Sequence, residues 1–211
     1  KVGEIMREYL ARSMTFQEYL NLIDDLLADG RTTGDDQSVE KVNFALLNRK
    51  RIERILKTFI PETAAAKSIS EIANARTWYV LTEGWCGDAA QSVPVIEQLV
   101  SLNPLLKTRY LLRDQNLGLM DQYLTNGSRS IPKGIAVHEG SGTVLWNWGP
   151  RPQAAQDLFA DLKAKNTPKE EMHEAIQRWY IADKGNSIAA EISELTKMGS
   201  VVATRAIAQM A

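Results

Sequence analysis

The sequence predicts an α/β fold, with a central mixed sheet flanked by helices, an added N-terminal helical hairpin and added C-terminal helices. Between residues 77 and 165, runs rich in aromatic and β-branched residues alternate with helical patterns. On either side of this region, apolar residues recur at helical spacing. With 211 residues, 44% of them hydrophobic, the chain is about twice the length of one ~100-residue α/β domain. We therefore expect an N-terminal helical extension at 1–66, the α/β domain at 67–166 and a C-terminal helical extension at 167–211.

The first sixty residues predict two helices joined by a polar loop. Thr15 and Glu18 have the spacing of a capping box, apolar residues follow at helical intervals, and Gly30 ends the pattern. A second helix is expected from Ser38 to Phe59. Its second half is basic, and we interpret these side chains as a solvated face rather than an anion-binding surface. The residues are Arg49, Lys50, Arg51, Arg54 and Lys57.

The central region supplies the elements of the predicted sheet in order. The weak segment 67–75 predicts a strand or a helix, and Gly118 to Thr125 predicts a short helix closed by Asn126 and Gly127. Strands are expected at 77–82, 108–112, 134–137 and 143–148, with helices at 89–100 and after the 149–152 segment. Because consecutive parallel strands need helical crossovers, this order is compatible with one sheet.

The C-terminal extension predicts further amphipathic helices. Apolar stripes occur on both sides of Gly185, through Met172 and Ile176 before it and Ile188 and Ile192 after it. These helices are expected to pack on the N-terminal helices or to form a homodimer with a second copy, and periodicity leaves both open. The segment from Gly199 to Ala211 is small and apolar and receives no assignment.

The only cysteine, Cys86, lies where an apolar strand gives way to a helix. The unpaired N–H groups of the first helical turn and the helix dipole favour thiolate over thiol at such a position. We therefore expect an exposed thiol whose pKa is modestly below that of free cysteine. Asp88 opposes this effect, although a carboxylate in the first turn is also an ordinary partner of the dipole.

The residues from Trp85 to Ala89 resemble the redox site of the thioredoxin superfamily, Trp-Cys-x-x-Cys at the end of a central strand. Ala89 stands where the resolving cysteine would be, and Val80 stands where thioredoxins usually carry a buried aspartate. Pro94, the Ile131-Pro132 pair and the strand between Gly142 and Gly149 also match the family pattern. The combination of a Trp-Cys-Gly-Asp-Ala site and a Trp-Gly-Pro-Arg-Pro segment at 148–152 resembles a bacterial subgroup with helical extensions.

The resemblance implies which residues form the site. Cys86 would be the catalytic nucleophile, and Pro132 would be a cis-proline placed against it. The substrate groove would contain Trp85, Gly87, Asp88, Ile131, Pro132 and Gly149. Three basic residues, Arg129, Lys133 and Arg151, are candidates for contact with a thiolate or an acidic thiol compound, and surface solubility is the other interpretation. His138 and His173 are isolated and no zinc spacing occurs, so we expect no metal and no cofactor.

The functional hypothesis is monothiol thiol–disulfide exchange, in which Cys86 forms a mixed disulfide that an external thiol resolves. Its substrate would be a protein disulfide or a small-molecule thiol. The alternative is a redox-inactive module that binds a partner in the same groove, and iron–sulfur assembly ranks third. A net charge of −1 argues against nucleic acid and membrane surfaces as partners. The first residues lack a secretion signal's apolar region, which favours the cytoplasm unless a leader was removed before Lys1.

Overall fold

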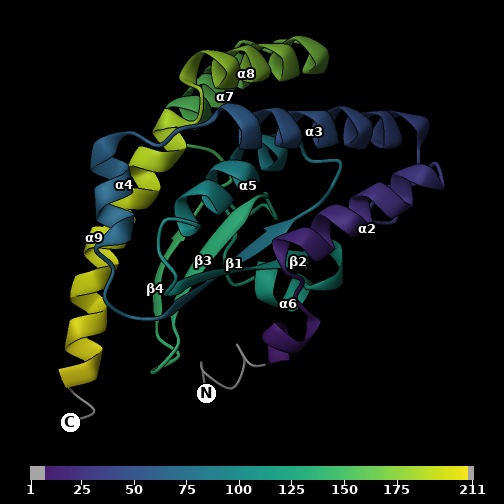
Figure 1. The fold of residues 1–211 in the computed structure, drawn as a ribbon. Helices are drawn as coiled ribbons and strands as arrows, with labels where there is room; N and C mark the ends of the chain where they lie inside the picture. The colour runs from purple at the N-terminus through teal and green to yellow at the C-terminus, as the bar shows by residue number, and fades with distance from the viewer. Residues whose placement is uncertain (1–7, 209–211) are drawn as a thin grey trace.

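The fold is built on a four-stranded mixed sheet in the order β2-β1-β3-β4. The structure, a computed structural model, describes residues 8–208, and the side chains of residues 8–200. Strand β1 (Arg76–Thr82) pairs in parallel with β2 (Leu106–Leu112) and antiparallel with β3 (Lys133–His138), which pairs antiparallel with β4 (Val144–Trp148). The predicted central mixed sheet flanked by helices is confirmed (Figure 1).

Strand β1 is central, and all seven of its residues are buried. Its aromatic and β-branched residues suit a strand that is covered on both faces. Trp78 contacts Trp146 of β4 edge to face, with ring centroids 4.9 Å apart. The two residues are in register with Ala136 of β3, which lies between them. Because β1 leads directly into the Cys86 segment, this packing holds the start of the following helix firmly in place.

Helix α5 (Gly87–Val100) follows β1 and is the most deeply buried helix in the described part of the chain. Pro94 lies inside it, so one intrahelical hydrogen bond is missing at that turn. Helix α3 (Val39–Thr58) packs along α5 on the side away from the sheet. Helix α7 (Gln153–Ala164) begins directly after Pro152, beyond the last strand.

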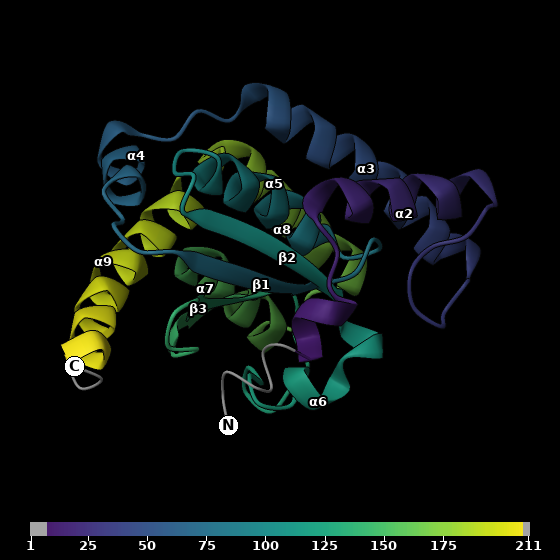
Figure 2. The ribbon, with the colours of Figure 1, turned by 60° about the horizontal axis from the view of Figure 1, so that its bottom comes forward.

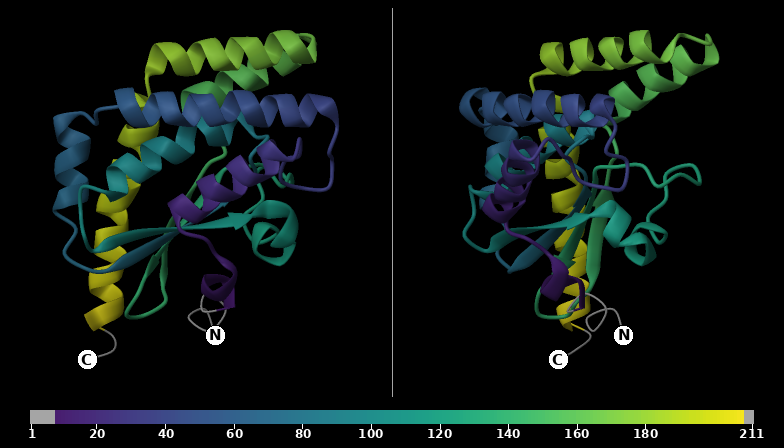
Figure 3. Two further views of the ribbon diagram at one scale, coloured as in Figure 1. Left: turned by 45° about the vertical axis from the view of Figure 1, so that its right-hand side comes forward. Right: turned by 90° about the vertical axis from the view of Figure 1, so that its right-hand side faces the viewer.

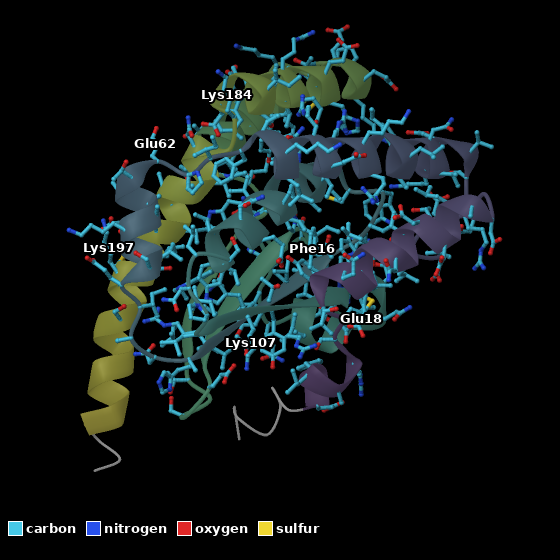
Figure 4. All side chains as sticks on the ribbon, viewed as in Figure 1. Phe16, Glu18, Glu62, Lys107, Lys184 and Lys197 are labelled. Atoms are coloured by element: carbon cyan, nitrogen blue, oxygen red, sulfur yellow. The ribbon has the colours of Figure 1, made fainter. Side chains whose placement is uncertain are left out.

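The N-terminal helices form as the sequence predicts. The capping box of Thr15 and Glu18 starts α2 (Phe16–Ala28), which ends before Gly30 in a left-handed conformation with φ of 67°. Phe16, beside Glu18 in the first turn (Figure 4), lies 5.6 Å from the ring of Tyr110 on β2. Ser38 caps α3, and only residues 67–70 of the undecided segment 67–75 are helical, as the end of α4 (Thr63–Ser70).

The C-terminal helices wrap around the same core. Helix α8 (Lys169–Asp183) ends at Lys184 and Gly185, both with positive φ, and α9 (Asn186–Ala208) then runs along α4 and β4 (Figures 1 and 3). A Cβ atom at Gly185 would lie 2.8 Å from Val95 of α5, so only glycine allows this close turn. Residues 199–208, which had no assignment, continue α9, whereas 209–211 lie outside the described residues.

One prediction for the central region is wrong in its extent. The short helix expected at 118–125 is α6 (Leu117–Met120), which ends five residues earlier. Asn126 and Gly127 instead form a turn between Thr125 and Ser128, whose backbones pair across it. Both turn residues have positive φ, which is the conformation that Asn-Gly favours in tight hairpins. Within residues 8–208, no helix is long and apolar enough to cross a membrane.

Candidate functional site

Cys86 is the residue that caps the N-terminus of α5. Its sulfur accepts a hydrogen bond from the Ala89 N–H at 3.5 Å and donates one to the Ile131 carbonyl at 3.4 Å. The strand β1 and the turn from Glu83 to Cys86 set this position from one side, and the segment before β3 closes it from the other. The side chain is 8% exposed. The thiol therefore faces the loop that carries Pro132.

The expectation of an exposed thiol with a lowered pKa is wrong. Burial raises the pKa of the Cys86 thiol to about 12, and the neighbouring Asp88 carboxylate adds to this rise. Hydrogen bonds from the Ala89 and Asp88 N–H groups lower the pKa, as the helix N-terminus should, and Arg151 does so more weakly. The local helix effect is present, but removal of the thiolate from water outweighs it.

The loop opposite the thiol is shaped by Gly149. The Ile131–Pro132 and Gly149–Pro150 peptide bonds are both cis. Gly149 has φ of 110°, and a Cβ atom there would lie 2.2 Å from the Pro132 carbonyl oxygen, so no other residue fits. The Lys133 ammonium joins the two segments by donating to the Gly149 carbonyl at 2.7 Å and to Thr125 Oγ1 at 2.8 Å. Lys133 is 4% exposed, and its contact with a thiolate or an acidic thiol compound stays a prediction.

Asp88 and Arg151 form an ion pair beside the thiol. Arg151 Nη2 lies 2.6 Å from Asp88 Oδ2, and its Nε donates to Oδ1 at 2.9 Å. Tyr180 of α8 donates a third hydrogen bond to the same carboxylate at 3.0 Å, and the Arg151 guanidinium stacks on Phe159. Burial raises the pKa of Asp88, while Arg151 lowers it. Arg151 is thus bound to a protein carboxylate, and its contact with a thiolate or an acidic thiol compound stays a prediction.

Arg129 is also paired within the protein. Its guanidinium binds both oxygens of Asp121, at 2.7 and 3.0 Å, and both side chains are nearly half exposed.

Trp85, the residue before the cysteine, has two cations near its ring. Lys41 Nζ lies 3.8 Å from the Trp85 ring centroid, and the Arg113 guanidinium lies 5.0 Å away.

These residues surround a groove of about 1160 Å³. Helix α3, helix α8, one face of α7 and the 125–131 loop line it, with Cys86 among the lining residues. Seven predicted site residues come together here: Trp85, Cys86, Gly87, Asp88, Arg129, Ile131 and Arg151. Three predicted site residues do not line the groove: Pro132, Lys133 and Gly149. They contact one another beneath its surface, through the Lys133–Gly149 hydrogen bond and the close approach of Gly149 to Pro132.

The structure adds residues that the sequence analysis did not select. Asn48 of α3 is buried, donates to the Gly84 carbonyl at 3.0 Å and accepts from Arg51 at 2.8 Å. Gln177 of α8 accepts a hydrogen bond from Gln91 of α5. A buried acid, Glu83, lies three residues before Cys86, and burial raises its pKa. Of these residues, only Glu83 could have been selected from the sequence, because it is a charged residue directly after an apolar strand.

Among the residues whose side chains the structure describes, no three of His, Cys, Asp or Glu lie close enough to hold a metal ion. The His173 ring meets the Phe44 ring of α3 edge to face, with ring centroids 6.1 Å apart, and His173 lines the same groove as Cys86. His138 hydrogen bonds to Ser141 in the hairpin between β3 and β4 and is not a groove-lining residue.

Comparison with known proteins agrees with the fold. The chain aligns over 90% of its length with the crystal structure of a protein of unknown function from Pseudomonas aeruginosa, covering 96% of that chain with a TM-score of 0.61 and 14% identity. It also matches the crystal structure of an HIV epitope scaffold, with a TM-score of 0.54, 15% identity, and coverage of 82% of this chain and 96% of that one. Both likenesses show the fold alone. No curated protein is similar enough to count as a relative. A family model described as Thioredoxin matches residues 36–163, more than half of the chain, and the protein therefore belongs to the thioredoxin family.

Proposed function

We propose that the protein carries out monothiol thiol–disulfide exchange through Cys86, with an external thiol completing each cycle. The observation that supports this is the position of the Cys86 sulfur, which is held between the Ala89 N–H and the Ile131 carbonyl and lines a groove of about 1160 Å³. The chain has no second cysteine, so the mixed disulfide cannot be resolved within the molecule.

The reaction has two steps. The Cys86 thiol loses its proton and attacks one sulfur of a disulfide RSSR, so that a Cys86–SR bond forms and the leaving thiolate takes up a proton as RSH. A second small thiol, R′SH, then attacks the SR sulfur, which releases RSSR′ and regenerates the Cys86 thiol. Because only the thiolate attacks and the folded thiol has a pKa of about 12, we expect slow exchange at neutral pH that accelerates steadily with pH.

The test is mass spectrometry of the protein after incubation with hydroxyethyl disulfide at pH 7 to 9.5. We expect a single adduct that forms faster at each higher pH and does not level off near 8.5, the usual pKa of a free cysteine. Cys86→Ser should give no adduct, and a small thiol should remove the adduct from the wild type. If the wild-type protein stays unmodified throughout this range while still folded, the exchange proposal is wrong.

A second candidate is the redox-inactive binding module, and the buried thiol with its raised pKa is the observation that favours it. In that case the groove would bind its ligand without any role for the sulfur. If the wild type and Cys86→Ser bind a compound in the groove with equal affinity, and hydroxyethyl disulfide forms no adduct, the protein is a binding module and the exchange proposal is rejected.

A further inference from the structure

The cationic side chains that line the groove fall into two groups. Four arginines have carboxylate partners within the protein: Arg113 with Asp114, Arg129 with Asp121, Arg151 with Asp88, and Arg178 with Glu174. Four others form no ion pair with the described side chains: Lys41, Arg51, Lys163 and Lys169. Of these, Lys163 and Lys169 are exposed and solvated, whereas Lys41 and Arg51 are half-buried. The two half-buried cations both belong to α3.

Arg51 lies next to the reactive segment. Its Nη1 atom would be 3.6 Å from a Cβ atom at Gly87, the residue after the cysteine. The guanidinium donates to Asn48 Oδ1, and Asn48 is itself anchored to the Gly84 carbonyl, so Arg51 is held in a defined direction. Burial lowers the pKa of Arg51, since the cation has lost water without gaining a carboxylate. A half-buried guanidinium of this kind keeps unused N–H donors that match a carboxylate.

Lys41 lies on the other side of the cysteine. Its ammonium rests on the ring of Trp85, the residue before Cys86, and has no carboxylate within ion-pair distance among the described residues. Lys41 and Arg51 are ten residues apart on one helix, about 15 Å along its axis. Phe44 and Leu47 lie between them on the same groove-lining face. The face thus has a cation at each end and an apolar middle.

We propose that this face of α3 binds an elongated small thiol, or its disulfide, that carries a carboxylate at each end, with Arg51 and Lys41 as the binding cations. The groove of about 1160 Å³ is slightly larger than the usual small-molecule site, and both α3 and α8 contribute lining residues, which suits an elongated small compound. The acidic residues that also line it weaken this charge only partly, because Asp88 and Glu174 are paired and Glu40 and Glu170 are exposed. The thiol part of the ligand rests on the exchange function proposed above, whereas the carboxylate site does not.

Binding can be tested without any exchange chemistry. S-methylglutathione is a peptide-like compound with two carboxylates and a blocked sulfur, and calorimetric titration measures its affinity directly. We expect it to bind the wild-type protein, more weakly as salt rises, and Arg51→Gln to reduce the affinity about tenfold. Lys50→Gln, which removes the same charge from an exposed position on the same helix, is the matched control and should have the wild-type affinity. Absence of binding, or equal loss in both variants, overturns the proposal.

Exchange kinetics provide a second, separable readout. For each variant, the rate with glutathione disulfide is divided by the rate with hydroxyethyl disulfide, which carries no charge. Arg51→Gln should lower this ratio about tenfold and Lys50→Gln should preserve it. A ratio that is unchanged in Arg51→Gln overturns the carboxylate site. Failure of both disulfides to react, with binding of S-methylglutathione that depends on Arg51, refutes the exchange function and leaves the carboxylate site standing.

Discussion

The two sides of the groove contain charged residues in opposite states. On one side, which we call the paired wall, Asp88 of α5 binds Arg151 and Tyr180 within the protein. On the other side, the α3 wall, Lys41 and Arg51 have no carboxylate partner among the described residues. Both walls adjoin Cys86. Charges that satisfy each other stabilise a fold, and a half-buried charge without a counter-ion is available for a ligand.

The two walls also differ in what they act on: one acts on the Cys86 thiol and the other on a compound in the groove. Asp88 and Arg151 act directly on the pKa of Cys86, one raising it and the other lowering it. In our proposal the α3 wall instead determines what charge a compound in the groove should carry. The paired wall would then control reactivity, and the α3 wall would control selection of the ligand.

The largest effect is expected from breaking the paired wall. Arg151→Met leaves the Asp88 carboxylate buried without its counter-ion, and loss of one partner of a buried pair costs about 3–5 kcal/mol of unfolding free energy. Urea denaturation at pH 7 measures this loss. Arg129→Met is the matched control, because it breaks an equally well-formed but exposed pair with Asp121 and should change stability much less. Similar losses in the two variants would show that the paired wall is not a special feature of the fold.

The next effect concerns the thiol. Asp88→Asn removes the negative charge that raises the pKa of Cys86 but keeps the shape of the side chain. We expect the thiol pKa to fall and alkylation by iodoacetamide at pH 8 to accelerate about tenfold, which corresponds to about one pKa unit. Lys50→Gln should alkylate at the wild-type rate. Slower alkylation in Asp88→Asn would mean that the Asp88 charge does not act on the thiol as the structure indicates.

Local sequence patterns predicted the elements that depend on near neighbours. The capping box of Thr15, the Ser38 cap of α3 and the buried strand before Cys86 each rest on residues within one or two turns, and the structure has all three. The mixed sheet is the one that the resemblance to thioredoxin implied, whereas the hydrogen bond from Cys86 to the Ile131 carbonyl is a detail that only the structure provides. In these regions short-range propensity and tertiary packing favour the same conformation.

The sequence could not predict the features that depend on distant segments. Tyr180 reaches Asp88 across 92 positions of the chain, and no periodicity connects a C-terminal helix to a helix start in the centre. The thiol pKa was mispredicted for the same reason, since desolvation by surrounding segments exceeds the local helix effect. The basic face of α3 was interpreted as solvated, which holds for the exposed side chains of Lys50, Arg54 and Lys57 but not for Arg51, which is half-buried in the groove.

The smallest effect is expected where the two walls approach each other, at Gly87. A Cβ atom there would lie 3.1 Å from Gln177 Nε2 and 3.6 Å from Arg51 Nη1, so Gly87→Ala displaces the end of a flexible side chain without a backbone clash. The gain in helix propensity offsets this displacement, and we expect unfolding free energy to change by less than about 1 kcal/mol. Since the methyl group occupies space beside Arg51, affinity for S-methylglutathione should fall by about two- to fivefold, or less than about 1 kcal/mol. Gly118→Ala in α6, where the nearest atom would be Tyr9 Oη at 3.7 Å, is the control and should bind as the wild type does. Calorimetric titration of both variants measures the difference, and unaltered affinity in Gly87→Ala would show that a bound carboxylate does not use the space between Arg51 and the start of α5.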